Sequence, residues 1–489
     1  MITAINYAPS YLQGVYNPII WSVTSNQIGQ PNFSYIFDVY INGAFQIRLK
    51  VKQNPSGVGM IDISQICQSY LLNDIIPETV FNAANVSQIF ADNTNSSLHA
   101  YVICGEEYGT VPVLYNGLGA VGNPAYNLFS RKLPPSTLDI PVHVWNSSVP
   151  FQQQQDAMSN GTTFSGAYGV LPSRTISYDW GNALFLTTLA NPLSFASLKQ
   201  KVYFRDVNVL SFINWSKYSS ILNDNYIAFC RIRYYNTNGA LINTYNASLD
   251  TLSGFTQKAN CSTVVNQQLN TRYDLVHVQC ELESLINYFN NRTSNSYVLQ
   301  PRQSMSIQMY THQTNNGCLT NIPSTREVRF TMLEDCDTLY TRVRLSWLND
   351  LGGRDYMNFT AFMEKETSTT NSNYYQETMN WSFTTPVPLN LTNPNSNLQT
   401  KGGDVIYNKQ ATTSWTLNTD WLTQDEVNLL EGLQKSSNVI AYFNDTTYNQ
   451  YAPQSVRIGQ TSYKTKNVKQ VKLVQGEFEI FLNQVQKIN

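Results

Sequence analysis

The sequence predicts a mainly β protein with two β-sandwich-like units, each carrying a short edge helix, and a C-terminal α+β domain with an antiparallel sheet. Three observations lead to this fold class. Alternating apolar and aromatic runs dominate the chain, the order of strand, Asn-Gly turn and strand occurs twice, and a well-capped helix precedes the last strands. A length of 489 residues also exceeds what one core supports. We therefore expect several domains.

The first β-sandwich unit is predicted over residues 1–110. Its strongest signal is Asn42-Gly43 between two strand-like runs, because both central residues of a type I′ turn need positive φ. The expected elements are a strand over 33–41, a strand over 45–51, a short helix from Asp62 with Ile63, Ile66, Cys67 and Tyr70 on one face, and a strand over 98–104.

The second unit is predicted over residues 201–325 and repeats that order. Its expected elements are strands over 226–235 and 241–245 around Asn238-Gly239, a strand over 276–280, a helix with Leu282, Leu285, Ile286 and Phe289 on one face, and a strand over 305–309. We expect the two Asn-Gly pairs to form tight hairpin turns in equivalent places of two related domains. Residues 111–200, rich in Ser, Gly and Asn, are expected to form a loop-rich connecting and interaction region.

The C-terminal α+β domain is predicted over residues 326–489. Thr423 and Glu426 have the spacing of a capping box, and we expect Thr423 to cap a helix. Residues 366–401 are expected to form a polar loop. The other expected elements are strands over 342–347 and 356–362 around a turn at 349–353, a buried helix face of Val427, Leu430 and Leu433, and strands over 439–443, 454–458, 462–466 and 477–482.

Composition favours assembly over catalysis. Charged residues make up 13% of the chain, against about 25% in an ordinary globular domain, and 31 tyrosines are present. Protein interfaces are depleted in Lys and Glu and enriched in Tyr, because a ring buries area at low entropy cost. The net charge of −2 provides no basic field for nucleic acid. We expect large contacts with other proteins and no specific nucleic-acid partner.

No motif for catalysis, a cofactor or a metal stands out. The four histidines are far apart in sequence, and the seven cysteines have no zinc or redox spacing. Acidic pairs such as Glu106-Glu107 are interpreted as turn or cap acids, although a glycosidase needs only two carboxylates. Buried, reduced cysteines are typical of a protein made in the cytoplasm. No secretory signal and no membrane-spanning run is visible.

Tryptophans in polar contexts are the candidate contact residues. Trp145, Trp180 and Trp381 lie in loop-like stretches, where a large ring is better explained as an anchor in a partner's pocket than as a core residue. A platform for carbohydrate is the alternative reading.

Three stretches resemble virion structural proteins of crAss-like and related tailed phages of Bacteroidetes hosts. They are Tyr16 to Ile20 with Phe37 to Gly43 and Asp62 to Ser64, then Cys336 through Phe359 with Arg344 to Asn349 and Gly352 to Asp355, and finally Leu433 through Val439 with Val456 to Ile458 and Ser462 to Lys464. The resemblance implies a short, non-contractile tail built from stacked rings and hub proteins. It favours a hub or ring protein over a fibre, because long repeats and a trimeric coiled coil are not visible.

The expected function is therefore that of a structural component of a phage tail, present in the virion after synthesis in the host cytoplasm. Expected partners are further copies of the chain and other tail proteins. Segments 111–200 and 366–401 should become ordered on assembly, because they contain too few apolar residues to offset their conformational entropy. Two alternatives remain open, an adhesin for host surface glycan and a capsule depolymerase.

Overall fold

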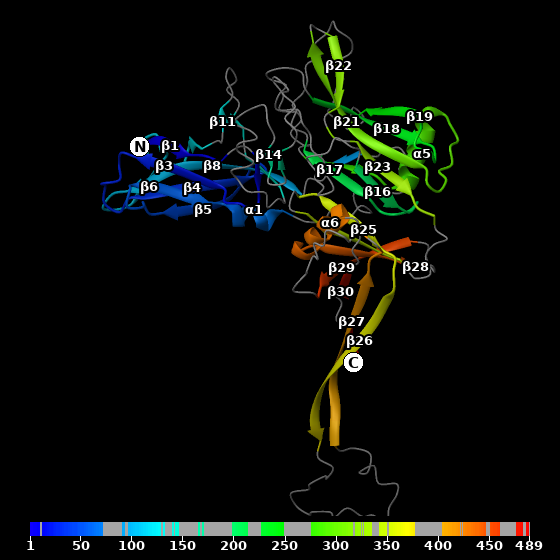
Figure 1. Ribbon diagram of the computed structural model, residues 1–489. Helices are drawn as coiled ribbons and strands as arrows, with labels where there is room; N and C mark the ends of the chain where they lie inside the picture. Colours follow the sequence, from blue (N-terminus) through cyan, green and yellow to red (C-terminus); the bar gives the residue numbers. More distant parts are fainter. Residues whose placement is uncertain are drawn as a thin grey trace, which may run out of the picture. The chain divides into compact units, whose positions relative to one another are not determined.

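The structure is a computed structural model, and the chain forms two compact units (Figure 1). The first contains Met1–Asp337, Trp347–Tyr356 and Asn428–Ser436, and the second contains the remaining residues. The residues that the structure describes are 1–9, 12–71, 90–92, 96–128, 131–132, 139–140, 142–145, 165–166, 169–170, 198–213, 226–248, 275–315, 318–323, 325, 327–334, 342–349, 352–376, 403–420, 422, 424–445, 450–459, 476–482 and 486–488.

The first sandwich consists of a small and a large sheet. The small sheet has the order β1-β3-β6, and the large sheet has the order β2-β13-β8-β4-β5 with β9 and β10 also on β8. Their bounds are β1 (Ile2–Tyr7), β2 (Leu12–Gly14), β3 (Ile20–Ser25), β4 (Ser34–Ile41), β5 (Ala44–Val51), β6 (Val58–Asp62), β8 (Ser97–Tyr108), β9 (Val113–Tyr115), β10 (Tyr126–Asn127) and β13 (Val142–Trp145), with the short helix α1 (Ser64–Tyr70) after β6.

Alternating side chains of both sheets form its core. Trp21 and Val23 of β3 and Phe37 and Val39 of β4 are fully buried, as is Val102 of β8. Because side chains alternate across a strand, the residues between them face away from this core.

The second sandwich has the same construction. Its large sheet has the order β16-β23-β21-β18-β19 with β22 on β21, and its small sheet has the order β17-β20-β7. The bounds are β7 (Phe90–Asp92), β16 (Leu198–Val202), β17 (Val209–Ile213), β18 (Tyr226–Tyr235), β19 (Leu241–Ser248), β20 (Leu275–Gln279), β21 (Ser304–Asn315), β22 (Cys318–Pro323) and β23 (Val328–Met332), with helix α5 (Leu282–Thr293) after β20. Its core includes Phe212, Ile232, Ile307 and Phe330 of the two sheets and Phe289 of α5.

The two large sheets share one strand order. When the five strands of each path are numbered by their order in the chain, both sheets have the spatial order 1-5-4-2-3. This order is β2-β13-β8-β4-β5 in the first sheet and β16-β23-β21-β18-β19 in the second. The first pair is parallel in both sandwiches, between β2 and β13 and between β16 and β23. In both, a helix follows the last strand of the small sheet in the chain. This shared order confirms the expectation of two related β domains.

The described strands extend beyond the predicted ends of both units. β13 follows residue 110 and joins the first large sheet, and β23 follows residue 325 and joins the second. Part of the region 111–200 is therefore sheet and not connection. Both strands are short and pair with residues distant in sequence, so local patterning did not assign them to a sheet.

The small sheets differ in the origin of the third strand. In the first sandwich β1 pairs with β3. In the second, β7 pairs with β20, although β7 lies between α1 and β8 in the chain. The second small sheet is thus completed by a segment from within the first repeat.

The two Asn-Gly turns differ. Asn42 and Gly43 have φ of 51° and 82° between the paired residues Ile41 and Ala44, as the type I′ prediction requires. Asn238-Gly239 also lies in a short hairpin turn, between the paired strands β18 and β19, but this turn is not of type I′. Of those two, only Gly239 has positive φ, and its N–H donates to the carbonyl of Asn236 at 3.0 Å, so the turn has three residues and a glycine bulge. The reason is that Asn236 Oδ1 accepts from the N–H groups of Asn238 and Ala240 at 3.0 and 2.8 Å.

The C-terminal sheet has eight strands in the order β25-β24-β28-β29-β30-β27-β26, with β31 also on β27. Its elements are β24 (Val343–Leu348), β25 (Arg354–Phe359), β26 (Met363–Gln376), β27 (Gly403–Asn418), helix α6 (Gln424–Lys435), β28 (Val439–Asp445), β29 (Gln450–Ile458), β30 (Glu477–Leu482) and β31 (Gln486–Ile488). α6 begins immediately after Thr423, and Thr423 itself lies outside the described residues, so its capping role stays a prediction.

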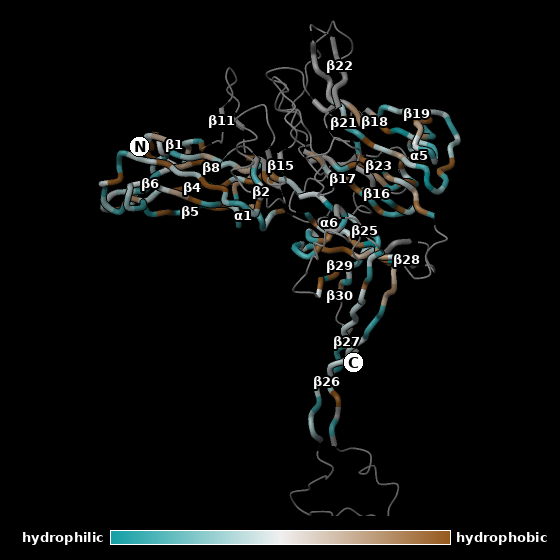
Figure 2. Tube along the Cα trace, viewed as in Figure 1, coloured by the Kyte–Doolittle hydropathy of each residue, from teal (hydrophilic) through white to brown (hydrophobic). Residues whose placement is uncertain are grey.

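The prediction of a polar loop over residues 366–401 is wrong for residues 366–376, which belong to strand β26. β26 and β27 pair in antiparallel register from Met363↔Leu417 to Gln376↔Gly403. Residues 367–373 of β26 are Thr, Ser and Asn without hydrophobic alternation, because both faces of the strand are largely exposed there. Figure 2 shows this hairpin as mostly hydrophilic, with hydrophobic residues toward its far end. Residues 377–402 lie outside the description. Two further strand pairs are β11 (Arg131–Lys132) with β12 (Asp139–Ile140) and β14 (Ser165–Gly166) with β15 (Gly169–Val170).

Candidate interaction surfaces

The predicted tryptophan anchors are not brought together by the described structure. Trp145 is the last residue of β13, where its backbone pairs with Ser97, and its side chain lies outside the description. Trp180 and Trp381 both lie outside the described residues. Their role as anchors stays a prediction, and the surfaces below are built from other residues.

The four cysteines whose side chains the structure describes are buried. Cys67, Cys104, Cys230 and Cys280 are buried free thiols. Burial raises the pKa of Cys67 and of Cys230 to about 12, so neither is a thiolate near neutral pH. Within the described ranges, no group of three His, Cys, Asp or Glu side chains could hold a metal ion. No described helix is long and apolar enough to cross a membrane.

His277 of β20 is a buried histidine with partners at both ring nitrogens. Its Nδ1 lies 2.7 Å from Ser211 Oγ, and its Nε2 lies 3.4 Å from Ser96 Oγ. Burial lowers the pKa of His277 to about 3, so the ring is neutral at physiological pH. This serine–histidine arrangement is fully enclosed, since His277 is 0% exposed, and it bridges β17, β20 and the segment before β8.

Glu281, immediately before α5, is a second buried titratable group. Burial raises the pKa of Glu281 to about 7, and the neighbouring carboxylate of Glu283 adds to the effect. Hydrogen bonds from Ser284 Oγ at 3.2 Å and Gln279 Nε2 at 3.3 Å partly offset the burial. These hydrogen bonds join Glu281 to the end of β20 and the first turn of α5, so we interpret Glu281 as a structural carboxyl.

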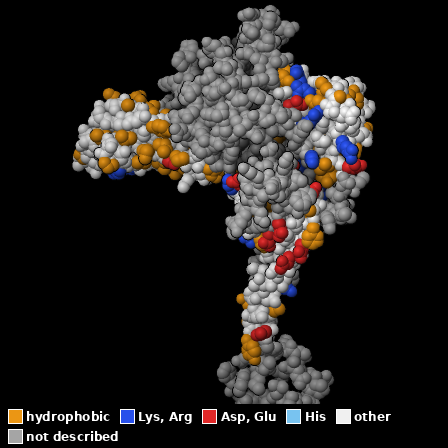
Figure 3. All heavy atoms as spheres, viewed as in Figure 1, with side chains coloured by type: hydrophobic (Ala, Val, Ile, Leu, Met, Phe, Trp, Pro, Cys, Tyr) orange, Lys and Arg blue, Asp and Glu red, His pale blue; other side chains and the backbone are white. Residues whose placement is uncertain are grey.

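The first candidate surface is the far part of the β26–β27 hairpin, which we call the tyrosine ribbon. Strand β31 pairs with β27 only at Lys409–Ala411, so residues 372–376 and 403–408 form a ribbon of two described strands. Its exposed large side chains are Tyr374 (48%), Tyr375 (69%), Ile406 (51%) and Tyr407 (66%). The Tyr374 and Tyr407 ring centroids lie 6.1 Å apart. Figure 3 shows hydrophobic side chains at the end of the described ribbon.

The outer edge of β26 belongs to the same surface. Among the described strands, β26 pairs with β27 and with no other. Residues 367–376 carry no charged side chain and no proline. Natural sheets usually protect a long edge with Lys, Pro or a bulge, because its unpaired N–H and C=O groups can bind another strand. This edge lacks the first two protections over ten residues.

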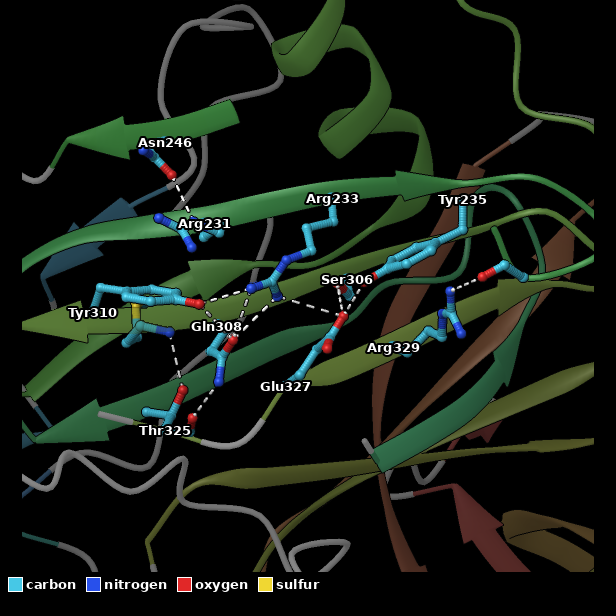
Figure 4. Close-up of polar contacts among 12 residues, drawn as sticks. Arg231, Arg233, Tyr235, Asn246, Ser306, Gln308, Tyr310, Thr325, Glu327 and Arg329 are labelled. Carbon is cyan, nitrogen blue, oxygen red and sulfur yellow. Dashed lines mark hydrogen bonds and ion pairs between the residues drawn. The ribbon is translucent and has the colours of Figure 1, made fainter. Parts of the chain in front are cut away.

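The second candidate surface, the arginine face, is the side of the second large sheet opposite the core (Figure 4). Cys230, Ile232 and Tyr234 of β18 are core residues, so Arg231, Arg233 and Tyr235 point to the other side. The neighbouring strands add to this face Asn246 of β19, Ser306, Gln308 and Tyr310 of β21, and Glu327 and Arg329 at β23.

An ion pair occupies the centre of the arginine face. Arg233 Nη1 lies 3.5 Å from Glu327 Oε1, and Arg233 also donates to Gln308 Oε1 at 3.1 Å and to Tyr310 Oη at 2.7 Å. Ser306 and Tyr235 donate their hydroxyl groups to Glu327. Burial alone would raise the pKa of Glu327, but these hydrogen bonds and the nearby guanidinium groups outweigh it and lower the pKa. The central carboxylate therefore stays ionised.

Two further guanidinium groups flank this pair. Arg231 lies over the Tyr310 ring with its Cζ 4.1 Å from the centroid, and its Nε donates to Asn246 Oδ1 at 3.0 Å. Arg329 lies over the Tyr235 ring at 3.5 Å. Stacking on a ring and one hydrogen bond hold a guanidinium in a fixed orientation.

The sequence contained part of the signal for the arginine face. Arg231, Arg233 and Tyr235 alternate on the predicted strand 226–235, which places them on one side. Their partners could not be predicted, because Gln308 and Glu327 are 75 and 92 residues away from the side chains they contact.

No known family matches the chain, and no characterised protein shows significant similarity to it.

Proposed function

We propose that this chain is a structural component of a bacteriophage virion, a tail hub or ring protein that contacts further copies of itself and other tail proteins. The observation that carries the proposal is the tyrosine ribbon. A two-stranded ribbon is at best marginally stable in water, and it gains stability when another surface covers it. Tyr375 (69% exposed) and Tyr407 (66% exposed) bury little of their ring area in the isolated chain, whereas a buried Tyr is a preferred anchor at interfaces.

The composition supports the same proposal independently. With 13% charged residues, the chain has little of the charge that keeps a free protein dispersed. Neutral polar side chains on the ribbon can form hydrogen bonds to a partner without the desolvation penalty of buried charges. The resemblance of three stretches to virion structural proteins of crAss-like phages favours a phage tail as the assembly.

Localisation on the particle tests the proposal. The protein would be sought in purified virions by mass spectrometry and placed by electron microscopy with an antibody label, and the purified protein would be imaged for rings. We expect a tail position in the virion. A host-glycan array and an assay for released sugar from host capsule run in parallel. Glycan binding by the isolated protein favours a tail-fibre or receptor-binding adhesin, and sugar release favours a depolymerase.

A ribbon variant tests the observation itself. Replacing Tyr374, Tyr375 and Tyr407 together with Ser should leave a folded protein, because all three side chains are exposed, and should abolish incorporation into particles. The matched control replaces the exposed Tyr16 and Tyr70 of the first sandwich with Ser. Normal incorporation of the ribbon variant would refute the proposed role of the ribbon.

A further inference from the structure

The arginine face carries positive charge that its internal ion pair does not neutralise. Among the residues labelled in Figure 4, three arginines (Arg231, Arg233 and Arg329) and one carboxylate (Glu327) sum to a net charge of +2, three positive charges less one negative. Arg233 and Glu327 neutralise each other at the centre, at 3.5 Å. The excess positive charge therefore lies on Arg231 and Arg329, on either side of that pair.

The guanidinium of Arg231 has two Nη groups that can donate hydrogen bonds to a ligand. Its Nε is bound to Asn246 Oδ1, and its guanidinium lies over Tyr310, while its two Nη groups have no partner among the described residues. Asn246 and Thr244 beside it on β19 are exposed, so solvent reaches this edge of the face. A guanidinium fixed in this way is pre-organised for bidentate contact with a carboxylate, at a reduced entropic cost.

Arg329 carries the second guanidinium that can bind a carboxylate. It lies over the Tyr235 ring, and its contact to the Gly239 carbonyl is long, at 3.4 Å. Arg231 and Tyr235 are four residues apart on β18, about 13 Å along the strand, and the Arg329 guanidinium lies over the Tyr235 ring. That spacing matches two side chains four residues apart on one face of an extended segment.

We propose that the arginine face binds an extended protein segment whose acidic side chains are four residues apart, with one carboxylate at Arg231 and the other at Arg329. Glu327 is the internal precedent, since a carboxylate already lies among these arginine, tyrosine and serine groups. A sugar is a poorer fit, because its hydroxyls need many free donors and acceptors. On this face Ser306, Gln308 and Tyr235 already bond to described partners. The proposal depends on this face alone and not on the virion assignment.

The test uses the full chain and a fluorescent peptide, acetyl-Thr-Glu-Thr-Val-Thr-Glu-Thr-amide, in a fluorescence anisotropy titration at low ionic strength. We expect the same peptide with Gln in place of both Glu residues to bind at least about tenfold more weakly. Arg231→Gln and Arg329→Gln should each weaken binding of the acidic peptide by a similar factor. Arg205→Gln is the control, because Arg205 is half exposed and pairs with Glu283 away from this face.

Asn246→Ala tests whether binding depends on the fixed orientation of the Arg231 guanidinium or only on the positive charge of the face. It leaves the net charge unchanged and removes the hydrogen bond that fixes Arg231, so we expect it to weaken binding about threefold or more. Arg231→Lys should also weaken binding, because Lys lacks the planar fork. Equal loss with Arg205→Gln, unchanged binding in the Arg231 and Arg329 variants, or tighter binding of a hyaluronate hexasaccharide than of the peptide would each overturn the proposal. Circular dichroism of every variant checks that it is folded.

Discussion

The pKa of Glu281 predicts a stability change near neutral pH. Its folded-state pKa, about 7, lies above the ordinary value of 4.5, so between these values the folded protein binds the proton more tightly than the unfolded chain. Stability contributed by protonated Glu281 is complete below about pH 4.5 and is lost as the pH rises through about 7. Glu281→Gln should therefore raise the stability of the second sandwich at pH 8 by about 1–3 kcal/mol.

Urea unfolding monitored by hydrogen exchange in α5 measures this effect. The variant and the natural protein should be nearly equal at pH 4.5 and should diverge as the pH rises. A constant difference between them at all pH values would show that Glu281 does not titrate in this range.

His277 predicts the opposite pH dependence. Because its folded-state pKa of about 3 lies below the ordinary 6.5, the unfolded chain takes up the proton first as the pH falls. Stability is lost from about pH 6.5 downward, toward pH 3. His277→Asn should cost stability at pH 7, since it removes contacts to Ser211 and Ser96, and that cost should shrink at pH 5. The check is the difference in unfolding midpoint at the two pH values, and a cost that grows on acidification would contradict it.

At the scale of elements, one turn recurs in the sheets. Asn54, Asn236 and Asn349 each begin a five-residue Asn-x-x-Gly-x turn, in which the glycine N–H donates to the asparagine carbonyl at 2.8–3.0 Å. The glycines Gly57, Gly239 and Gly352 have φ of 77°, 78° and 86°. In each turn the asparagine Oδ1 also accepts a backbone N–H from the fifth residue. One side chain thus fixes a wider turn than Asn-Gly alone predicts.

Asn236→Ala should destabilise the second sandwich by about 1 kcal/mol, because two backbone N–H groups lose their side-chain acceptor. Asn236→Asp keeps an acceptor at the same position and should cost less. The unfolding midpoint of each variant in urea gives the comparison. Equal losses for Ala and Asp would mean that the hydrogen bonds to Asn236 do not stabilise the turn.

Elements with strong alternation and turn residues were predictable from sequence. β18 runs from Tyr226 to Tyr235 and β30 from Glu477 to Leu482, as predicted. β26 was not predicted, because a strand exposed on both faces has no hydrophobic period. The tyrosine ribbon therefore followed only from the pairing of β26 with β27.

At the scale of the whole molecule, two sandwiches have one strand order, and the second contains a strand that comes from within the first repeat. β7 reaches β20 from within the first repeat, and Ser96, close to its end, contacts His277. Sequence could suggest the repeat, because both copies place a hairpin and a helix in the same order. It could not show that β7 joins the second sandwich, since β7 is three residues long and its partner is more than 180 residues away.

Hydroxyl-radical footprinting tests most directly the central claim that the tyrosine ribbon is an assembly contact. Tyr374, Tyr375 and Tyr407 should be oxidised in the isolated protein, because they are exposed, and protected in intact phage particles. The buried Tyr35 and Tyr442 should resist oxidation in both samples and serve as internal controls. Equal oxidation of the ribbon tyrosines in both samples, or absence of the protein from the particles, would contradict the account.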